Sequence, residues 1–108
     1  MKDTLTSLYS VVENRKTNPE EGSYTCYLFD KGLDKILKKV GEETAETIIA
    51  AKNGSNEELK NELCDLIYHL MVLMVERGLP LTEVLGELDE RSAKIGNLKK
   101  MKAVDKNT

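Results

Sequence analysis

Hydrophobic residues recur every three or four positions along most of the chain, and this spacing predicts amphipathic helices. The first predicted helix covers residues 3–16, with Leu5, Leu8 and Val12 on one face. Asp3 is one expected N-cap for this helix, and Thr4, the next residue, is the other. Residues 17–23 contain Pro, Gly and Asn, a composition that predicts a loop.

A second helical pattern extends over residues 25–52 and is interrupted only by Gly32 and Gly41. A glycine inside a helix costs about 1 kcal/mol relative to alanine, so each of the two needs a reason. We expect Gly41 to allow the close approach of a neighbouring backbone, a ligand or a second subunit.

A short turn around Gly54 separates this pattern from the next one. Ser55 or Asn56 is expected to cap a helix that ends before Gly78. Residues 81–95 predict a last helix. We therefore expect an all-α fold, a four-to-five-helix bundle built around a central antiparallel helical hairpin and completed by dimerisation.

Each helix of the hairpin has a predicted apolar stripe. The first stripe contains Leu33, Ile36, Leu37, Val40, Thr44 and Ile48, and the second contains Leu59, Leu63, Leu66, Leu70 and Met74. Met71, Met74 and Val75 continue the apolar surface beyond what one hairpin can cover. We expect these three residues to lie in a dimer interface.

Four acidic residues flank these stripes in two spaced pairs, Glu43 with Glu46 and Glu62 with Asp65. Glu43 and Asp65 each lie eleven residues from Gly54, whereas Glu46 and Glu62 each lie eight residues from it. An antiparallel hairpin therefore brings both pairs to the same height, and the helical repeat places them along one lip of the hairpin. Carboxylates held this close raise one another's pKa values unless a cation lies among them.

The four side chains offer only hard oxygen donors, and no His or Cys is placed to complete a zinc site. This donor set favours Mg²⁺, with Mn²⁺ as a substitute. Mg²⁺ in proteins is often bound by carboxylates and by phosphate groups of the substrate at the same time. The expected substrate is therefore a nucleotide or another phosphorylated small molecule.

Length, charge and cysteine content limit the domain organisation, the partners and the cellular compartment of the protein. The 108 residues predict one domain over residues 1–96 and a basic, mobile tail over residues 97–108. The formal net charge of −3 argues against a nucleic-acid partner. Cys26 and Cys64 have no metal-binding spacing, which indicates a reduced, cytoplasmic protein. No apolar run is long enough to predict a membrane span.

Three segments carry a resemblance to a known family. They are residues 23–25 (SYT), residues 39–46 (KVGEETAE) and residues 62–70 (ELCDLIYHL). Together they resemble phosphoribosyl-ATP pyrophosphatase of histidine biosynthesis, a member of the MazG-like all-α nucleoside triphosphate pyrophosphatases. The spaced acidic residues alone resemble the wider superfamily, whereas the three segments together are more specific. The resemblance covers about residues 5–90.

The resemblance implies hydrolysis of 1-(5-phosphoribosyl)-ATP to the corresponding AMP and pyrophosphate, with Mg²⁺, in the second step of histidine biosynthesis. It also implies an intertwined homodimer with sites near the subunit interface. The expected metal ligands are Glu43, Glu46, Glu62 and Asp65. Glu42 is a candidate for supporting a ligand or activating water, because a carboxylate that binds no metal is the better base.

Four further residues are candidates for supporting roles. Lys39 is expected to contact a phosphate as a point charge. Arg15 and Tyr24 are candidates for contacts with the sugar-phosphate end of the substrate. His69 follows Asp65 by four residues, so it is expected to lie beside that carboxylate and orient it through a hydrogen bond.

Three alternatives remain open. A housekeeping nucleotide pyrophosphatase, acting on dUTP, dCTP or damaged triphosphates, would share the carboxylates but not the SYT and YHL segments. A non-catalytic helical dimerisation module would bind no Mg²⁺. A di-iron carboxylate bundle normally needs two Glu-x-x-His motifs, and the only His in this chain has Leu66 three residues before it.

Overall fold

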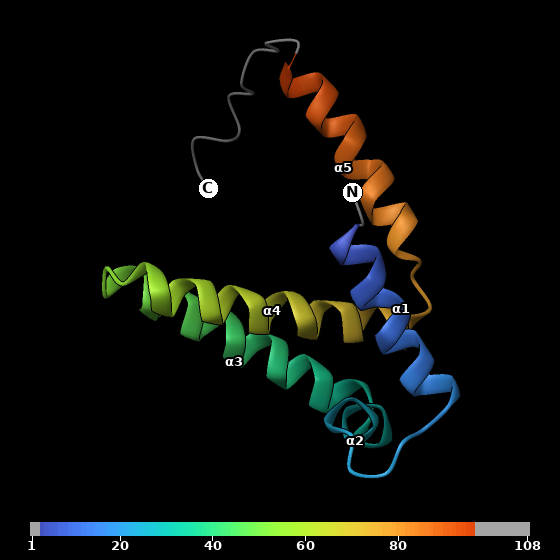
Figure 1. Cartoon of the computed structure of the whole chain (residues 1–108). Coiled ribbons are helices and arrows are strands. Elements are labelled where there is room, and N and C mark those ends of the chain that lie inside the picture. Colours follow the sequence, from blue (N-terminus) through green and yellow to red (C-terminus); the bar gives the residue numbers. More distant parts are fainter. Residues whose placement is uncertain (1–2, 97–108) are drawn as a thin grey trace.

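The computed structural model describes residues 3–96, and within that range it contains five helices and no strand. The helices are α1 (Thr4–Thr17), α2 (Tyr24–Lys31), α3 (Leu33–Lys52), α4 (Asn56–Arg77) and α5 (Leu81–Gly96) (Figure 1). This confirms the all-α class and the helical hairpin. The predicted basic tail, residues 97–108, lies outside the described residues.

The helix ends follow local sequence signals. The Asp3 side chain accepts a hydrogen bond from the Leu5 backbone N–H at 3.0 Å and is the N-cap of α1. Ser55 caps α4 in the same way, with its hydroxyl oxygen 3.1 Å from the Glu58 backbone nitrogen. Of the alternatives that the sequence left open, Asp3 and Ser55 are therefore the caps.

Gly32 and Gly41 have different roles. Gly32 has φ +94° and ψ −174°, a conformation open essentially to glycine alone, and it divides the long helical pattern into α2 and α3. Gly41 lies inside α3, and a Cβ atom built on it would meet nothing within 4 Å. No backbone of the described chain therefore approaches Gly41 closely, and contact with a ligand or a second subunit stays a prediction.

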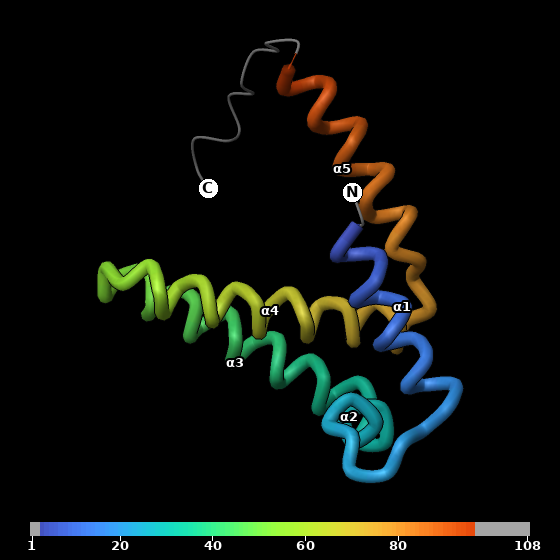
Figure 2. The backbone as a smooth tube through the Cα atoms, viewed as in Figure 1, coloured from blue at the N-terminus to red at the C-terminus, as the bar shows by residue number. Residues whose placement is uncertain are grey.

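The α3–α4 hairpin is the longest unit of the fold. The two helices run antiparallel along most of their length, while α1 packs across α4 and α2 packs at the base of the hairpin (Figures 1 and 2). The tip of the hairpin extends away from α1 and α2, and α5 leads away from the other helices (Figure 2).

The core lies where α1 and α2 meet the hairpin. Its buried members are Val12, Leu28, Ile36, Met71, Val72, Val75 and Leu81. The prediction that Met71 and Val75 lie in a dimer interface is wrong, because their own chain buries them to 3% and 8% exposure. The third residue, Met74, packs against the same core. Helix α1 packs over this part of α4 and buries it. The hydrophobic pattern of the hairpin alone could not predict this contact with α1.

The face that each hairpin helix buries also differs from the predicted stripe. The buried residues of α3 are Ile36, Glu43 and Ala50, which recur every seven positions. Leu37 and Ile48 are 45% and 59% exposed although both belong to the predicted stripe. Glu43 therefore lies in the seam between the helices and not on its flank, and part of the apolar surface faces outward.

Among the described residues, no helix combines the length and the hydrophobicity needed to cross a membrane.

Candidate functional site

Three of the predicted acidic residues meet between α3 and α4. Glu43, Glu62 and Asp65 each contribute one carboxylate oxygen to a group in which all the oxygens lie within 4.8 Å of one another. Glu43 comes from α3, and the other two come from α4, on the opposite side of the turn. The structure therefore brings both predicted pairs to the same height along the hairpin.

The carboxylates are unusually short of partners. Glu43 is 7% exposed, and its Oε1 atom is buried without a hydrogen-bond partner, as is Oε1 of Glu62. Burial raises the pKa of Glu62, and the Glu46 side chain and the negative charges of Glu46, Glu43 and Asp65 raise it further. Buried polar oxygens without partners are costly, so this site is suited to a cation.

Glu46, the fourth predicted ligand, lies beside Glu62 at the edge of the group. The two residues line a small pocket of about 160 Å³ that also includes Asn53 and Glu58 near the turn of the hairpin. Glu46 itself is exposed and does not belong to the close group of three. It can therefore approach a cation or ligand from the solvent side.

The donor set fits a hard divalent cation. Glu43, Glu62, Asp65 and Glu46 offer only carboxylate oxygens, which Mg²⁺ and Mn²⁺ prefer. Cys64 is exposed on α4 and does not belong to the group. The two unpartnered buried oxygens could bind such a cation without breaking an existing hydrogen bond.

Lys39 and Glu42 lie next to this group. The Lys39 ammonium is 3.4 Å from Oε1 of Glu42 and 3.8 Å from Oε2 of Glu43. The Glu42 side chain is 44% exposed and stays outside the group of three. Lys39 thus places a positive charge, and Glu42 a carboxylate open to solvent, at the border of the group formed by Glu43, Glu62 and Asp65.

The predicted contact between His69 and the Asp65 carboxylate is not formed. Instead, Nδ1 of His69 lies 2.7 Å from the Asp65 backbone carbonyl oxygen, one turn earlier in α4. On the other side of the ring, Nε2 lies 3.0 Å from the Tyr24 hydroxyl. The carbonyl group is the nearer partner because residues four apart on a helix place a side chain over the preceding turn.

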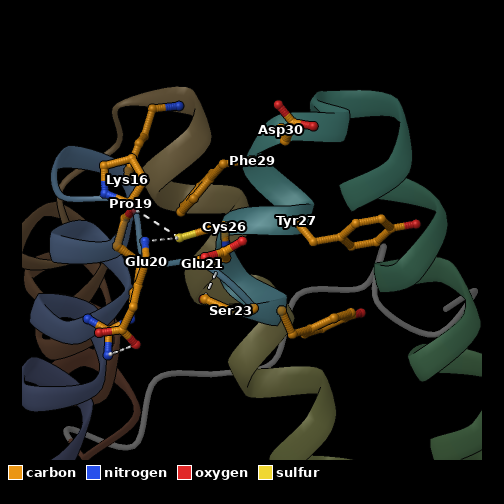
Figure 3. Close-up of a pocket in the computed structure, with 12 residues that line it drawn as sticks. Lys16, Pro19, Glu20, Glu21, Ser23, Cys26, Tyr27, Phe29 and Asp30 are labelled. Carbon is orange, nitrogen blue, oxygen red and sulfur yellow. Dashed lines mark hydrogen bonds and ion pairs between the residues drawn. The ribbon is translucent and has the colours of Figure 1, made fainter.

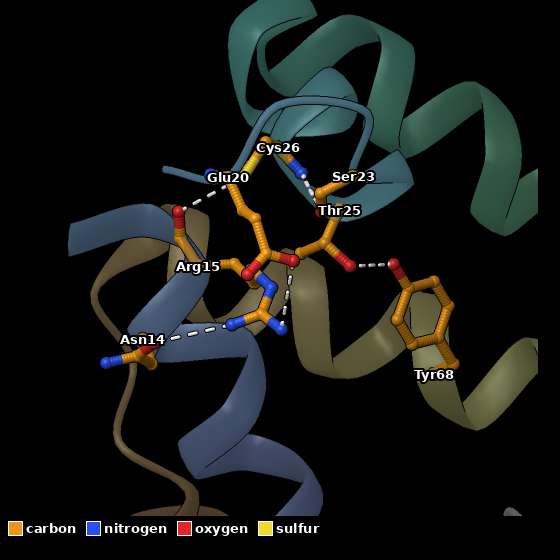
Figure 4. A network of polar contacts seen from close by, with 7 residues as sticks. All are labelled: Asn14, Arg15, Glu20, Ser23, Thr25, Cys26 and Tyr68. Atoms are coloured by element: carbon orange, nitrogen blue, oxygen red, sulfur yellow. Dashed lines mark hydrogen bonds and ion pairs between the residues drawn. The ribbon is translucent and has the colours of Figure 1, made fainter. Parts of the chain in front are cut away.

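Sequence reasoning missed a second contact beside this one. The Thr25 hydroxyl is hydrogen bonded to the Tyr68 hydroxyl (Figure 4). Together with the bond between Tyr24 and His69, two consecutive residues of α2 therefore bond two consecutive residues of α4. The rings of Tyr24, Tyr68 and His69 also pack together, with centroids 4.9–6.2 Å apart. The polar and aromatic residues of the SYT and YHL segments were the available signal, although their partners are 43 and 45 positions apart.

Arg15 lies apart from the carboxylates, in a different pocket. This open pocket has a volume of about 900 Å³ and lies between the end of α1, the following loop and α2 (Figure 3). Arg15 forms an ion pair with Glu20, with 3.6 Å between Nη2 and Oε1. Tyr24 also lines the pocket. Of the predicted sugar-phosphate residues, Arg15 lines only the larger pocket, whereas Tyr24 lines this pocket and is also within reach of the charges of Lys39 and Glu43.

Comparison with known proteins identifies one family. Residues 5–92 match the family described as phosphoribosyl-ATP pyrophosphohydrolase. A phosphoribosyl-ATP pyrophosphatase of Clostridium botulinum (strain Hall) is 58% identical over 97 residues, which cover 90% of this chain and 88% of that protein. The protein of the same name from Listeria welshimeri is 54% identical over 101 residues, covering 94% and 97%. A third, from Limosilactobacillus fermentum, is 59% identical over 95 residues, covering 88% and 90%.

Proposed function

This chain belongs to the phosphoribosyl-ATP pyrophosphohydrolase family, and on that premise we propose that it hydrolyses 1-(5-phosphoribosyl)-ATP to 1-(5-phosphoribosyl)-AMP and pyrophosphate, in the second step of histidine biosynthesis. The family match confirms the resemblance carried by residues 23–25, 39–46 and 62–70. It also makes the chain an enzyme of the hydrolase class. The observation that supports the reaction is the group of Glu43, Glu62 and Asp65 with its unpartnered buried oxygens.

We propose Mg²⁺ as the cofactor of this reaction. Glu43, Glu62 and Asp65 would hold it in the seam of the hairpin, and Glu46 would complete the protein ligands from the exposed edge. When bound, Mg²⁺ would neutralise charge on phosphate oxygens at the bond that is cleaved. The carboxylates would in turn lose the mutual repulsion that, after burial, raises the pKa of Glu62.

Two residues at the border of the group have proposed roles toward the substrate. Lys39 is close enough to the carboxylates to meet a phosphate that shares their cation. Glu42 keeps a solvent-exposed carboxylate near the same place and is our candidate for taking a proton from the attacking water. Because its pair with Lys39 is at the surface, a phosphate bound to Lys39 would free Glu42 for that role.

Pyrophosphate release by the purified protein tests the proposal. The assay compares phosphoribosyl-ATP, ATP and dUTP in the presence of Mg²⁺, with EDTA as the control. The expected result is rapid, EDTA-sensitive release from phosphoribosyl-ATP and little from the other two. A preference for dUTP would favour the housekeeping pyrophosphatase, and no release from any of the three would favour the non-catalytic module.

We further propose that the working protein is a homodimer formed through the hairpin. Large apolar side chains are exposed on both helices: Leu37, Ile48, Ile49, Leu63, Ile67 and Leu70, each 36–59% exposed. Leu37, Gly41 and Ile48 recur at intervals of four and seven, so they share one face of α3. A second copy on this face would bury the stripe and would give Gly41 its close neighbour.

Sedimentation of the protein at micromolar concentration tests the dimer. The expected particle has twice the mass of one chain, and Ile48→Lys is expected to shift it toward the monomer. Val11→Lys is the matched control, because Val11 is 53% exposed but lies on α1, away from the hairpin face. A monomeric wild-type protein, or equal effects of the two substitutions, would contradict the proposed interface.

The cytoplasm is the compartment that we propose for this enzyme. The structure has two free cysteines, Cys26 and Cys64, and no disulfide among the described residues, as a reducing compartment favours. Fractionation of cells that express the tagged protein tests this proposal, and recovery outside the cytoplasmic fraction would contradict it.

A further inference from the structure

Two adjacent hydrogen bonds join the start of α2 to the middle of α4. Tyr24 bonds His69, with 3.0 Å between the hydroxyl oxygen and Nε2, and Thr25 bonds Tyr68 through their hydroxyl groups. His69 is 5% exposed. We call these four residues the interhelix clasp, and its two α4 members, Tyr68 and His69, lie about one helical turn after Asp65.

The hydrogen bond from His69 to the Asp65 carbonyl determines which atom donates in the bond between His69 and Tyr24. A backbone carbonyl can only accept, so Nδ1 of His69 carries the proton that it donates to the Asp65 carbonyl oxygen at 2.7 Å. In the neutral ring, Nε2 then has a lone pair and accepts. With the ring neutral, the Tyr24 hydroxyl therefore donates its proton to Nε2 of His69.

The phenol can make this donation at neutral pH. Burial is the largest cause that raises the pKa of Tyr24 above its ordinary value of 10.0, and the charge of Glu43 also raises it, while Lys39 opposes the rise. The hydroxyl has a single hydrogen. With that hydrogen bonded to His69, the Tyr24 oxygen presents only lone pairs to a ligand.

This polarity decides what Tyr24 can recognise. A phosphate oxygen is an acceptor and gains nothing from an oxygen that offers lone pairs, whereas a sugar hydroxyl is a donor. Tyr24 lines the pocket of about 900 Å³, and it is also close enough to Glu43 and Lys39 for their charges to act on its hydroxyl group. Tyr24 is therefore near both the carboxylates, where the phosphates of the substrate are proposed to bind, and the larger pocket.

The substrate has a sugar at the matching point. In the proposed reaction, the cleaved phosphates lie at the carboxylates, and the next group along the nucleotide is the ribose that carries the triphosphate. Resting on the proposed function, we propose that Tyr24 accepts a hydrogen bond from a hydroxyl of this ribose and that His69 is the positioning residue that turns the Tyr24 oxygen toward it.

Steady-state kinetics with deoxy substrates tests this inference. Wild-type protein and Tyr24→Phe are compared on phosphoribosyl-ATP and on its 2′-deoxy and 3′-deoxy forms at that ribose. Loss of one hydrogen bond is expected to lower kcat/KM about tenfold, mainly through KM. For the wild-type protein, kcat/KM should be about tenfold lower on one of the deoxy substrates than on phosphoribosyl-ATP. For Tyr24→Phe, kcat/KM on phosphoribosyl-ATP should already be lowered by that factor, and it should be no lower on that deoxy substrate.

Substitutions of His69 separate positioning from packing. His69→Gln keeps an oxygen that can accept from Tyr24, so it is expected to retain most of the discrimination between the ribose and deoxy substrates. His69→Leu fills similar space without an acceptor and is expected to behave like Tyr24→Phe. Thr25→Val is the matched control, because it removes the neighbouring bond of the clasp but leaves Tyr24 and His69 paired. It should discriminate as the wild-type protein does.

The outcomes distinguish this inference from the proposed function. If the wild-type protein does not hydrolyse phosphoribosyl-ATP, the proposed function fails. If the wild-type protein is active but Tyr24→Phe loses the same factor on all three substrates, only the ribose contact is overturned. Equal discrimination by His69→Leu and His69→Gln would overturn the positioning role of His69. Thermal melting of each variant identifies any loss that comes from unfolding.

Discussion

The ammonium group of Lys39 lies 3.8 Å from the buried carboxylate of Glu43. This contact links the charged surface of α3 to the three carboxylates of Glu43, Glu62 and Asp65. The same ammonium is 3.4 Å from Glu42. A cation in this place can meet a phosphate without a large movement of its side chain. It also balances part of the negative charge that the hairpin brings together.

Lys39→Gln is therefore expected to weaken substrate binding more than it slows turnover. Loss of one charged contact with a phosphate should raise KM about tenfold while kcat changes little. Steady-state kinetics on phosphoribosyl-ATP measures both constants. Lys38→Gln is the control, because Lys38 is the exposed neighbour on the same helix. A fall in kcat at unchanged KM would argue for a role in the chemical step instead.

Glu62→Gln is expected to have opposite effects on activity and on stability. Removing a metal ligand should lower kcat/KM by at least about a hundredfold. The same change removes one of several mutually repelling charges, so the melting temperature in EDTA should rise. Glu57→Gln, at an exposed position of α4 that is paired only with Lys60 among the described residues, should change neither. A Glu62→Gln variant with wild-type activity would remove Glu62 from the ligand set.

The pH dependence of these effects follows from the raised pKa of Glu62. A carboxyl group whose pKa is higher in the folded protein stabilises the fold below its unfolded value, and this contribution is lost as pH rises through the folded pKa. Since Gln resembles the protonated form, the difference in melting temperature between Glu62→Gln and wild type in EDTA should be small below the ordinary value of 4.5 and should grow toward neutral pH. A difference that is independent of pH would contradict this account.

Affinity for Mg²⁺ should change with pH for the same reason. Carboxylate ligands bind metal only when they are deprotonated, so Mg²⁺ and the proton compete for Glu62. Titration calorimetry is expected to show binding that weakens as pH falls, beginning above 4.5 because the pKa of Glu62 is raised. Ca²⁺, which also takes oxygen ligands, serves as the control cation and should show the same trend.

The sequence predicted the hairpin and its carboxylates because both depend on local rules. Helical periodicity placed α3 and α4, the turn at Gly54 made them antiparallel, and the equal distances of Glu43 and Asp65 from that turn fixed their common height. No contact with another part of the chain was needed for these steps. The metal role of the residues remains a prediction.

The burial of Glu43 could not be predicted in this way. The predicted apolar stripe places Leu37 and Ile48 in the seam, but both are exposed, and the seam contains the Glu43 carboxylate instead. Likewise, the bonds of Tyr24 to His69 and of Thr25 to Tyr68 join residues more than 40 positions apart. Such contacts depend on how α2 packs against α4, which periodicity within either helix does not specify.

Leu28→Ala tests the core that holds α2 in place. Leu28 is fully buried in the cluster formed by α1, α2, α3, α4 and the start of α5. Truncation should lower the free energy of unfolding by about 2–5 kcal/mol through lost burial and a residual cavity. Urea unfolding followed by circular dichroism measures the change. Val11→Ala, at a position that is 53% exposed, should stay within about 0.5 kcal/mol of wild type.

The two glycines that end helices should differ in how they tolerate asparagine. Gly78 ends α4 with φ +69° and ψ +27°, a left-handed conformation that Asn often adopts. Gly32 has φ +94° and ψ −174°, a conformation that residues other than glycine rarely adopt. A Cβ atom at either position would meet nothing within 4 Å, so crowding does not separate the two sites.

Gly32→Asn is therefore expected to lower the free energy of unfolding by about 1–3 kcal/mol, whereas Gly78→Asn should cost about 1 kcal/mol or less. Urea unfolding of both variants gives the comparison. The Gly32 variant should also lose phosphoribosyl-ATP turnover, because strain between α2 and α3 displaces Tyr24 relative to Lys39 and Glu43. Equal losses of stability would show that the backbone at residue 32 can relax into a conformation open to other residues.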